Sequence, residues 1–175
     1  LFRWDEHLER FFESAAVYDM AIEYDRDELT AAARRLVSEQ ALDSCYVRPV
    51  AFYGYGRLGI DPTAPTSVPT RVAMACWPWG AYLGDDALER GIDVGVSSWR
   101  KNASEAVPAT AKTGGAYVNS VLASQEATRD GYDEALLLDS EGTVAEGPGE
   151  NLFLVRDGEL YTPGLAADVL DGVTR

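Results

Sequence analysis

Short strand patterns dominate the chain from residue 45 onward, and they constrain its fold more than any other feature. Residues 45–53 alternate in polarity and are rich in aromatic and β-branched side chains, and residues 135–138 form a fully apolar run. Asp157 and Gly158 separate two further strand patterns, which predicts a β-hairpin over residues 151–162. We also expect strands at residues 71–77, 91–99 and 143–146. Sheets built from such short pieces are expected to be mostly antiparallel.

Three helical patterns accompany these strands. Residues 4–18 carry apolar side chains at helical spacing, and Asp25 followed by Glu28 predicts a capping box with a second helix behind it. Residues 116–129 predict a third helix that ends at Gly131. The fold class is therefore α+β, with mostly antiparallel sheets and packed helices. The aromatic segment 77–86, bracketed by Pro and Gly, is expected to be a crossing between domains.

Composition excludes several functional classes. The 175 residues carry a net charge of −14, which disfavours binding to nucleic acid or to an anionic membrane surface. We find no apolar run long enough to span a bilayer and no signal-peptide pattern, so we expect a cytoplasmic protein. Cys45 and Cys76 are interpreted as core thiols, and no pattern indicates a metal site. The chain begins without Met and ends where a helix pattern could start, so we expect a piece of a longer protein, truncated at both ends.

Residues 111–117, with the sequence AKTGGAY, contain Lys112, one of only two lysines in the chain. Paired glycines follow it at the predicted start of a helix, where backbone amides favour an anion. Two interpretations are open at this point. Lys112 is either a Schiff-base lysine beside an anion site or a surface lysine before a helix.

Several motifs occur together in one order along the chain. They occupy residues 1–3 with 6–10, 46–49, 79–84, 111–117, 146–153 and 172–175. In this combination the chain resembles the fold-type IV pyridoxal-phosphate enzymes, and most closely the branched-chain amino acid aminotransferases. The resemblance implies a two-domain architecture. Residues 1–84 would form the small N-terminal α/β domain without its N-terminal strands, and residues 85–175 the first part of the large cofactor-binding domain.

The resemblance implies pyridoxal 5'-phosphate as cofactor and assigns residues to its ring. Lys112 would be the catalytic residue, which forms the Schiff base and carries the proton in the reaction. Glu146 would pair with the pyridine nitrogen and keep it protonated, and Tyr117 would bond the phenolic oxygen. Pro148 departs from the small residue that the family has in this motif, which predicts a stiffer turn after Glu146.

The phosphate and substrate groups follow from the same resemblance. Arg10 would bind the phosphate, with Val173 and Thr174 supplying backbone amides and a hydroxyl. The substrate contacts would come from four residues, namely Tyr46, Arg48, Trp79 and Tyr82. Because Tyr46 and Arg48 are two residues apart on a predicted strand, their side chains share one face.

The implied activity is transamination of leucine, isoleucine or valine with 2-oxoglutarate by a ping-pong mechanism. The partners would be these amino acids and 2-oxo acids, in a homodimer or larger homo-oligomer. One alternative is another enzyme of the same fold, namely a D-amino acid aminotransferase, an (R)-amine transaminase or an aminodeoxychorismate lyase. The other alternative is a catalytically silent fragment.

Overall fold

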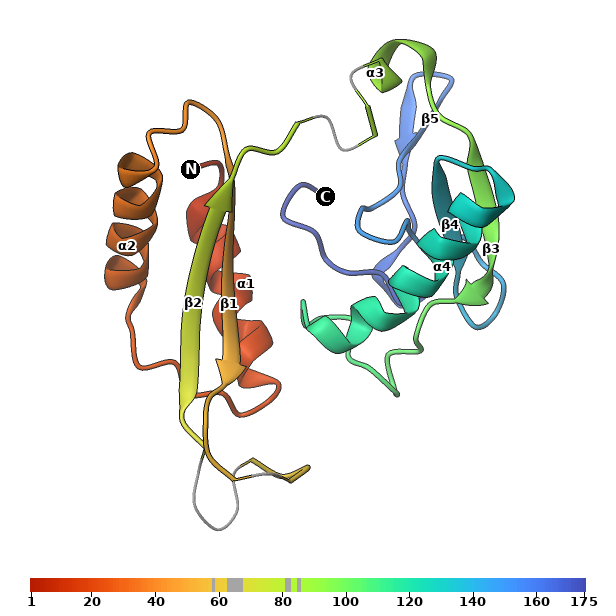
Figure 1. Cartoon of the computed structure of the whole chain (residues 1–175). Helices are drawn as coiled ribbons and strands as arrows, with labels where there is room; N and C mark the ends of the chain where they lie inside the picture. The colour runs from red at the N-terminus through yellow and green to blue at the C-terminus, as the bar shows by residue number, and fades with distance from the viewer. Residues whose placement is uncertain (58, 63–67, 81–82, 85) are drawn as a thin grey trace. The chain divides into compact units, whose positions relative to one another are not determined.

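The computed structural model describes residues 1–57, 59–62, 68–80, 83–84 and 86–175. It divides into two compact units, Leu1–Tyr82 (unit 1) and Leu83–Arg175 (unit 2), which Figure 1 shows in a red-to-blue colour ramp. The boundary lies within the aromatic segment 77–86. The assignment of residues 1–84 and 85–175 to a small and a large domain stays a prediction. Within the described residues, no helix combines the length and hydropathy needed to cross a membrane.

Unit 1 consists of two helices followed by two strands. They are α1 (Trp4–Ala16), α2 (Arg26–Glu39), β1 (Tyr46–Tyr53) and β2 (Thr70–Trp77), with β1 and β2 paired antiparallel. The predicted capping box is confirmed, because the Glu28 amide donates to Asp25 Oδ1 at 2.8 Å and the Asp25 amide donates to Glu28 Oε2 at 2.9 Å. The first helix ends at Ala16 and not at residue 18.

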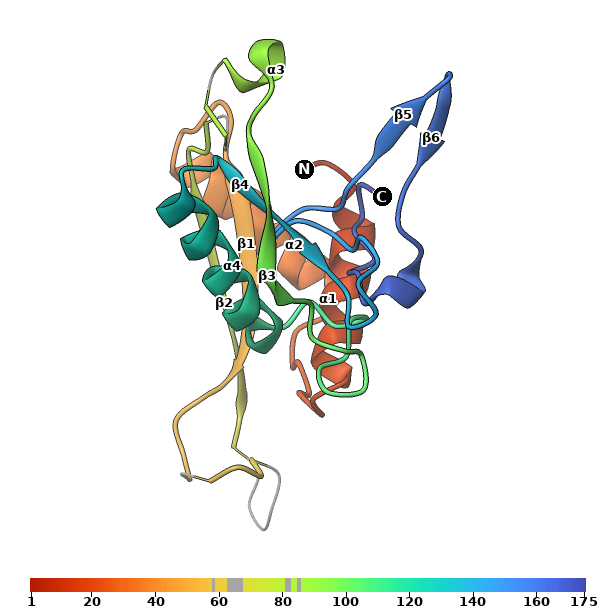
Figure 2. The ribbon, with the colours of Figure 1, turned by 90° about the vertical axis from the view of Figure 1, so that its right-hand side faces the viewer.

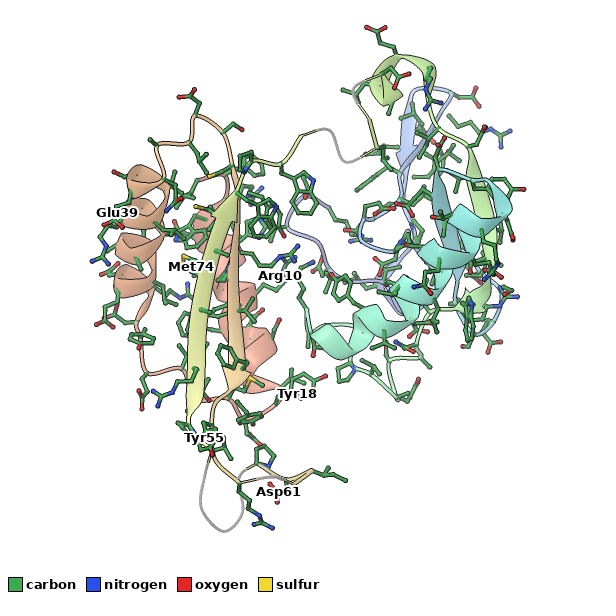
Figure 3. All side chains as sticks on the ribbon, viewed as in Figure 1. Arg10, Tyr18, Glu39, Tyr55, Asp61 and Met74 are labelled. Atoms are coloured by element: carbon green, nitrogen blue, oxygen red, sulfur yellow. The ribbon has the colours of Figure 1, made fainter. Side chains whose placement is uncertain are left out.

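The core of unit 1 lies where the helices meet. Leu8 of α1 and Leu29 and Ala33 of α2 are almost fully buried, and Trp4 Nε1 donates to Thr30 Oγ1 across the two helices at 2.9 Å. Met74 projects from β2 on the side of α2 (Figure 3). Along β1 exposed residues alternate with half-buried ones, so one face of the sheet is left to solvent or a ligand.

The two cysteines do not lie in the core. Cys45 and Cys76 are half-buried free thiols, so they are less buried than the core thiols that we expected. Partial burial raises the pKa of the Cys76 thiol, and its hydrogen bond with Cys45 raises it further. The reason is that a two-stranded sheet covered on one side cannot enclose residues near its end.

Unit 2 is built around a parallel strand pair. Its elements are α3 (Ala87–Arg90), β3 (Val94–Arg100), a 3₁₀ turn (Gly114–Ala116), α4 (Tyr117–Asp130), β4 (Glu134–Leu138), β5 (Leu154–Arg156), β6 (Glu159–Tyr161) and a second 3₁₀ turn (Leu165–Ala167). β3 and β4 pair in parallel, with α4 in the connection between them, as a parallel pair requires (Figure 1). Ala123 and Ala127 of α4 pack on Ala135 and Leu137 of β4.

The remaining strand expectations hold with shifted boundaries, except the one for residues 143–146. The hairpin at Asp157 and Gly158 is confirmed, with φ of 53° and 81° as a type I′ turn requires, and Figure 2 shows β5 and β6 side by side. Two of the three described strand pairs are antiparallel. Residues 143–146 form only an isolated bridge, Leu138 with Val144, and not a strand. Even so, the Ala145 amide donates to the Leu137 carbonyl and the Leu137 amide to the Glu146 carbonyl, both at 3.0 Å, so Glu146 lies beside β4.

Candidate active site

Lys112 and Tyr117 contact each other. Lys112 Nζ donates to the Tyr117 hydroxyl at 2.6 Å and lies 5.1 Å from the centre of its ring. Ala111 is buried, and the Thr113 amide donates to its carbonyl at 2.9 Å, so a tight turn presents Lys112 just before the 3₁₀ turn and α4. The five-residue spacing across this turn is what brings the amine onto the phenol.

Glu146 is held by donors from three directions. Lys101 Nζ donates to its Oε1 at 2.6 Å, Asn151 Nδ2 to its Oε2 at 2.9 Å, and the Leu170 amide to both oxygens at 3.3 and 3.2 Å. The side chains of Lys101 and Glu146 are 13% and 7% exposed, so this ion pair is buried. A carboxylate has about four acceptor positions. The four contacts place two on each oxygen, and the Leu170 amide shares its single hydrogen between the two oxygens.

Asn151 connects Glu146 to the end of the chain. Its Nδ2 also donates to the Leu170 carbonyl at 2.9 Å. A Cβ at position 172 would lie 2.1 Å from Asn151 Oδ1, so only glycine fits there while Asn151 keeps its hydrogen bonds. Val173 and Thr174 follow in a turn closed by the Arg175 amide, which donates to the Gly172 carbonyl at 2.9 Å. Two of the predicted phosphate residues, Val173 and Thr174, therefore lie close in sequence to Leu170 and Gly172, which contact Glu146 and Asn151.

Residues 100–102 link the Lys112–Tyr117 pair to Glu146. Asn102 Nδ2 donates to the Ala116 carbonyl at 3.4 Å, and Asn119 of α4 donates to the Arg100 carbonyl. Between them, the Lys101 amide donates to the Leu138 carbonyl at 2.8 Å while its side chain reaches Glu146. This segment follows the carboxyl end of β3, next to the carboxyl end of β4. Ligands of sheets with parallel strands commonly bind at such an edge.

Further carboxylates surround Glu146. Partial desolvation raises the pKa of Glu150, and the negative charges of Glu134 and Glu146 raise it further. Glu150 belongs to the turn after Glu146, where the Gly147 amide donates to the Glu150 carbonyl at 3.0 Å. This turn forms with Pro148 in it. Glu150 and Glu146 are thus close enough for their charges to interact, and Lys101 pairs with Glu146.

A second group of predicted residues lies on the exposed face of the sheet in unit 1. The rings of Tyr46, Trp77 and Trp79 lie with centroids 4.8 to 5.6 Å apart. Arg48 Cζ lies 5.0 Å from the ring of Tyr46, 5.1 Å from Trp77 and 6.0 Å from Trp79. The structure thereby brings three of the four predicted substrate residues together. The fourth, Tyr82, lies outside the described residues.

Arg10 stands on α1 in unit 1 (Figure 3), half-buried, with its Nη2 3.4 Å from His7 Nδ1. The predicted residues therefore fall into two groups, one in each unit. The role of Arg10 toward phosphate stays a prediction.

Four contacting residues had no role assigned from the sequence: Lys101, Asn102, Asn151 and Trp77. The signals for them in the sequence were weak. Lys101 is the second of the two lysines and follows a predicted strand, and Asn151 stands inside a motif of the resemblance. Trp77 is recognised only through the strand register, which sets it opposite Tyr46.

The family model for amino-transferase class IV matches residues 1–175, the whole chain. The chain belongs to this family. A branched-chain-amino-acid aminotransferase of Escherichia coli strain K12 is 45% identical over 175 residues, which cover all of this chain and 56% of the relative. The chain therefore spans about half the length of the curated relatives it matches.

Solved structures of class IV aminotransferases agree with the fold. The Escherichia coli branched-chain amino acid aminotransferase matches with a TM-score of 0.94 at 44% identity, over 99% of this chain and 56% of that one. A T.th. branched-chain amino acid aminotransferase with pyridoxamine 5'-phosphate matches with a TM-score of 0.90 at 47% identity, over 99% and 56%. Other structures of the T.th. enzyme are complexes with N-(5'-phosphopyridoxyl)-L-glutamate and with 4-methylvaleric acid. The expected α+β architecture of fold-type IV is confirmed.

Proposed function

We propose that this chain is part of a pyridoxal 5'-phosphate-dependent branched-chain amino acid aminotransferase, which moves amino groups between leucine, isoleucine or valine and 2-oxoglutarate in a ping-pong cycle. One observation carries the proposal most directly. Segment 100–102 ties the Lys112–Tyr117 pair to the buried carboxylate of Glu146 in one unit. The family match and the names of the relatives supply the reaction class.

The residues of unit 2 fit this cofactor by their chemistry. Bound pyridoxal 5'-phosphate acts as an electron sink for the carbanion at the substrate Cα. Glu146 is a buried carboxylate, whose negative charge would suit a protonated ring nitrogen. Lys112 would supply the amine for covalent attachment, and its free amine would then carry the proton between the substrate Cα and the cofactor's C4′. Tyr117, 2.6 Å from Lys112 Nζ, orients that amine.

The substrate assignment rests on the unit 1 group and on relatives. Arg48 carries a fork of N–H donors suited to a carboxylate, while Tyr46 and Trp79 offer apolar ring surface for a branched side chain. The T.th. enzyme forms complexes with a phosphopyridoxyl derivative of glutamate and with 4-methylvaleric acid, a branched apolar acid. We propose the same two substrate classes for this chain, with Arg10, Val173 and Thr174 toward the cofactor phosphate.

The test uses protein purified from the complete reading frame and loaded with cofactor. We expect visible absorbance, and borohydride reduction followed by peptide mapping should attach the cofactor to Lys112 and not to Lys101. Lys112→Ala should lack both the absorbance and the attachment, and its turnover should fall by roughly 10²- to 10⁴-fold.

A substrate panel separates the related activities. Formation of glutamate from 2-oxoglutarate with L-leucine, L-isoleucine or L-valine supports the proposal. Activity restricted to D-alanine or to a chiral amine would assign the protein to one of the alternative enzymes of this fold. Absence of any bound cofactor would support the silent fragment.

We further propose a homodimer or larger homo-oligomer in the cytoplasm, by analogy with the family. Light scattering of the purified protein should give at least twice the mass of one chain. A monomeric mass would contradict this part of the proposal.

A further inference from the structure

Glu146 is not the only carboxylate in this part of unit 2. Glu134 is also buried, and Glu150 is close enough for Glu134 and Glu146 to raise its pKa. A buried carboxylate such as Glu146 needs a paired cation or hydrogen-bond donors.

Lys101 supplies the opposite charge at this place. Its Nζ lies 2.6 Å from Glu146 Oε1, and its side chain is 13% exposed. A charge-assisted hydrogen bond of this length is strong and directional. Because Lys101 takes a position on Oε1 and Asn151 one on Oε2, the carboxylate cannot rotate freely.

The backbone fixes Lys101 independently of its side chain. Its amide donates to the Leu138 carbonyl of β4, and its neighbours Arg100 and Asn102 accept from Asn119 and donate to the Ala116 carbonyl. The ammonium group is therefore held at the end of β3, between the turn that bears Lys112 and the carboxylate of Glu146. A flexible surface lysine would lack these constraints.

We propose that Lys101 is a positioning residue for the cofactor, which holds the Glu146 carboxylate in its orientation toward the pyridine nitrogen. The inference rests on the proposed function, since it needs the cofactor ring at Glu146. It adds a residue that acts through Glu146 and not on the substrate.

The experiment compares four variants of the complete protein: Lys101→Met, Lys101→Gln, Lys101→Arg and Arg129→Met. Met removes both charge and hydrogen bond, Gln keeps a donor without charge, and Arg keeps both. Arg129 is an exposed cation near the end of α4 in the same unit, so Arg129→Met controls for loss of one positive charge. Circular dichroism and melting of the cofactor-free proteins establish which variants are folded.

Two measurements report on the ring nitrogen and not on turnover. The ¹⁵N chemical shift of bound, ring-labelled cofactor should move toward that of a neutral pyridine in Lys101→Met and Lys101→Gln. The dissociation constant of the cofactor should rise roughly tenfold or more in Lys101→Met, as expected for loss of a charged hydrogen bond. Lys101→Arg should restore both values, and Arg129→Met should match the wild type.

Each outcome has a consequence. A wild-type shift in Lys101→Met would overturn the role of Lys101 while leaving the proposed function in place. If Lys101→Met does not fold, the ¹⁵N shifts of Lys101→Gln and Lys101→Arg are compared instead. A wild-type shift in Lys101→Gln would then overturn the role of Lys101. A wild-type protein that binds no cofactor would overturn both proposals.

Discussion

The two units stabilise a cationic side chain in different ways. Arg48 in unit 1 lies on an exposed strand face and stacks against the rings of Tyr46, Trp77 and Trp79. Lys101 in unit 2 is mostly buried and paired with the Glu146 carboxylate. Stacking uses the flat face of a guanidinium, whereas hydrogen bonding uses its edge. The arrangement in unit 1 therefore suits recognition of an incoming carboxylate, and that in unit 2 suits the fixing of an internal one.

Breaking the ion pair of unit 2 should have the largest effect on stability. Glu146→Gln leaves Lys101 buried without its counter-charge, so the free energy of unfolding should fall by about 3–5 kcal/mol. Urea unfolding of the cofactor-free protein measures this change. The double variant Glu146→Gln with Lys101→Met should lose less than the sum of the single losses, because the second substitution removes the unpaired charge. Strict additivity would show that the pair is not coupled.

Removing the Arg48 cation of unit 1 should affect substrate binding more than stability. Arg48→Met should raise the KM for amino acid and 2-oxo acid roughly tenfold or more, through loss of a charged hydrogen bond. The free energy of unfolding should change by only about 0.5–1 kcal/mol, as expected for an exposed cation–aromatic contact. Steady-state kinetics and melting curves measure the two effects. Arg71→Met is the matched control, since Arg71 is exposed on the neighbouring strand. Equal KM values in both variants would remove Arg48 from the substrate site.

Glu126 shows how a carboxylate is held by hydroxyl and amide donors. Its oxygens accept from the Ser97 hydroxyl and from the hydroxyl and amide of Ser98, and these bonds lower the pKa of Glu126 below its ordinary value of 4.5. A lowered pKa in the folded state adds stability above pH 4.5, and this contribution is lost as pH falls through the folded-state pKa.

We therefore expect Glu126→Gln to lower the urea midpoint at pH 7 and to flatten its decline below pH 4.5. Urea titrations at several pH values measure both changes, and Glu105→Gln at an exposed position is the control. An unchanged pH profile would mean that the serine contacts do not stabilise the ionised form.

The substitution Glu150→Gln should have the smallest effect on stability. It tests whether repulsion among Glu134, Glu146 and Glu150 costs folding free energy. Partial desolvation and the charges of Glu134 and Glu146 raise the pKa of Glu150 above 4.5, so its ionised form destabilises the folded state. This cost is present at neutral pH and is relieved as pH falls through the folded-state pKa. Glu150→Gln should therefore raise the free energy of unfolding at pH 7 by less than about 1 kcal/mol and leave it unchanged near pH 3. A destabilised variant at pH 7 would show that Lys101 already balances the cluster.

Much of the fold was predictable from local sequence. The capping box at Asp25 and Glu28 and the type I′ hairpin at Asp157 and Gly158 formed as expected, because both depend on backbone geometry within a few residues. Residues 143–146 were predicted as a strand but form only a bridge and a few backbone bonds beside β4. Local propensity specifies an extended conformation there, whereas the length of a ladder depends on the neighbouring segment.

By itself, the sequence indicated which of the proposed site residues lie close together within each unit. Lys112 and Tyr117 are separated by a single turn, and Tyr46 and Arg48 by one strand repeat. The proximity of the two residues in each pair therefore follows from local geometry. Only the tertiary structure decided that Lys101 meets Glu146, 45 residues away, and that Trp77 closes the ring cluster over Arg48. Such contacts depend on strand pairing and on burial, which bring together residues whose separation in the chain carries no periodic signal.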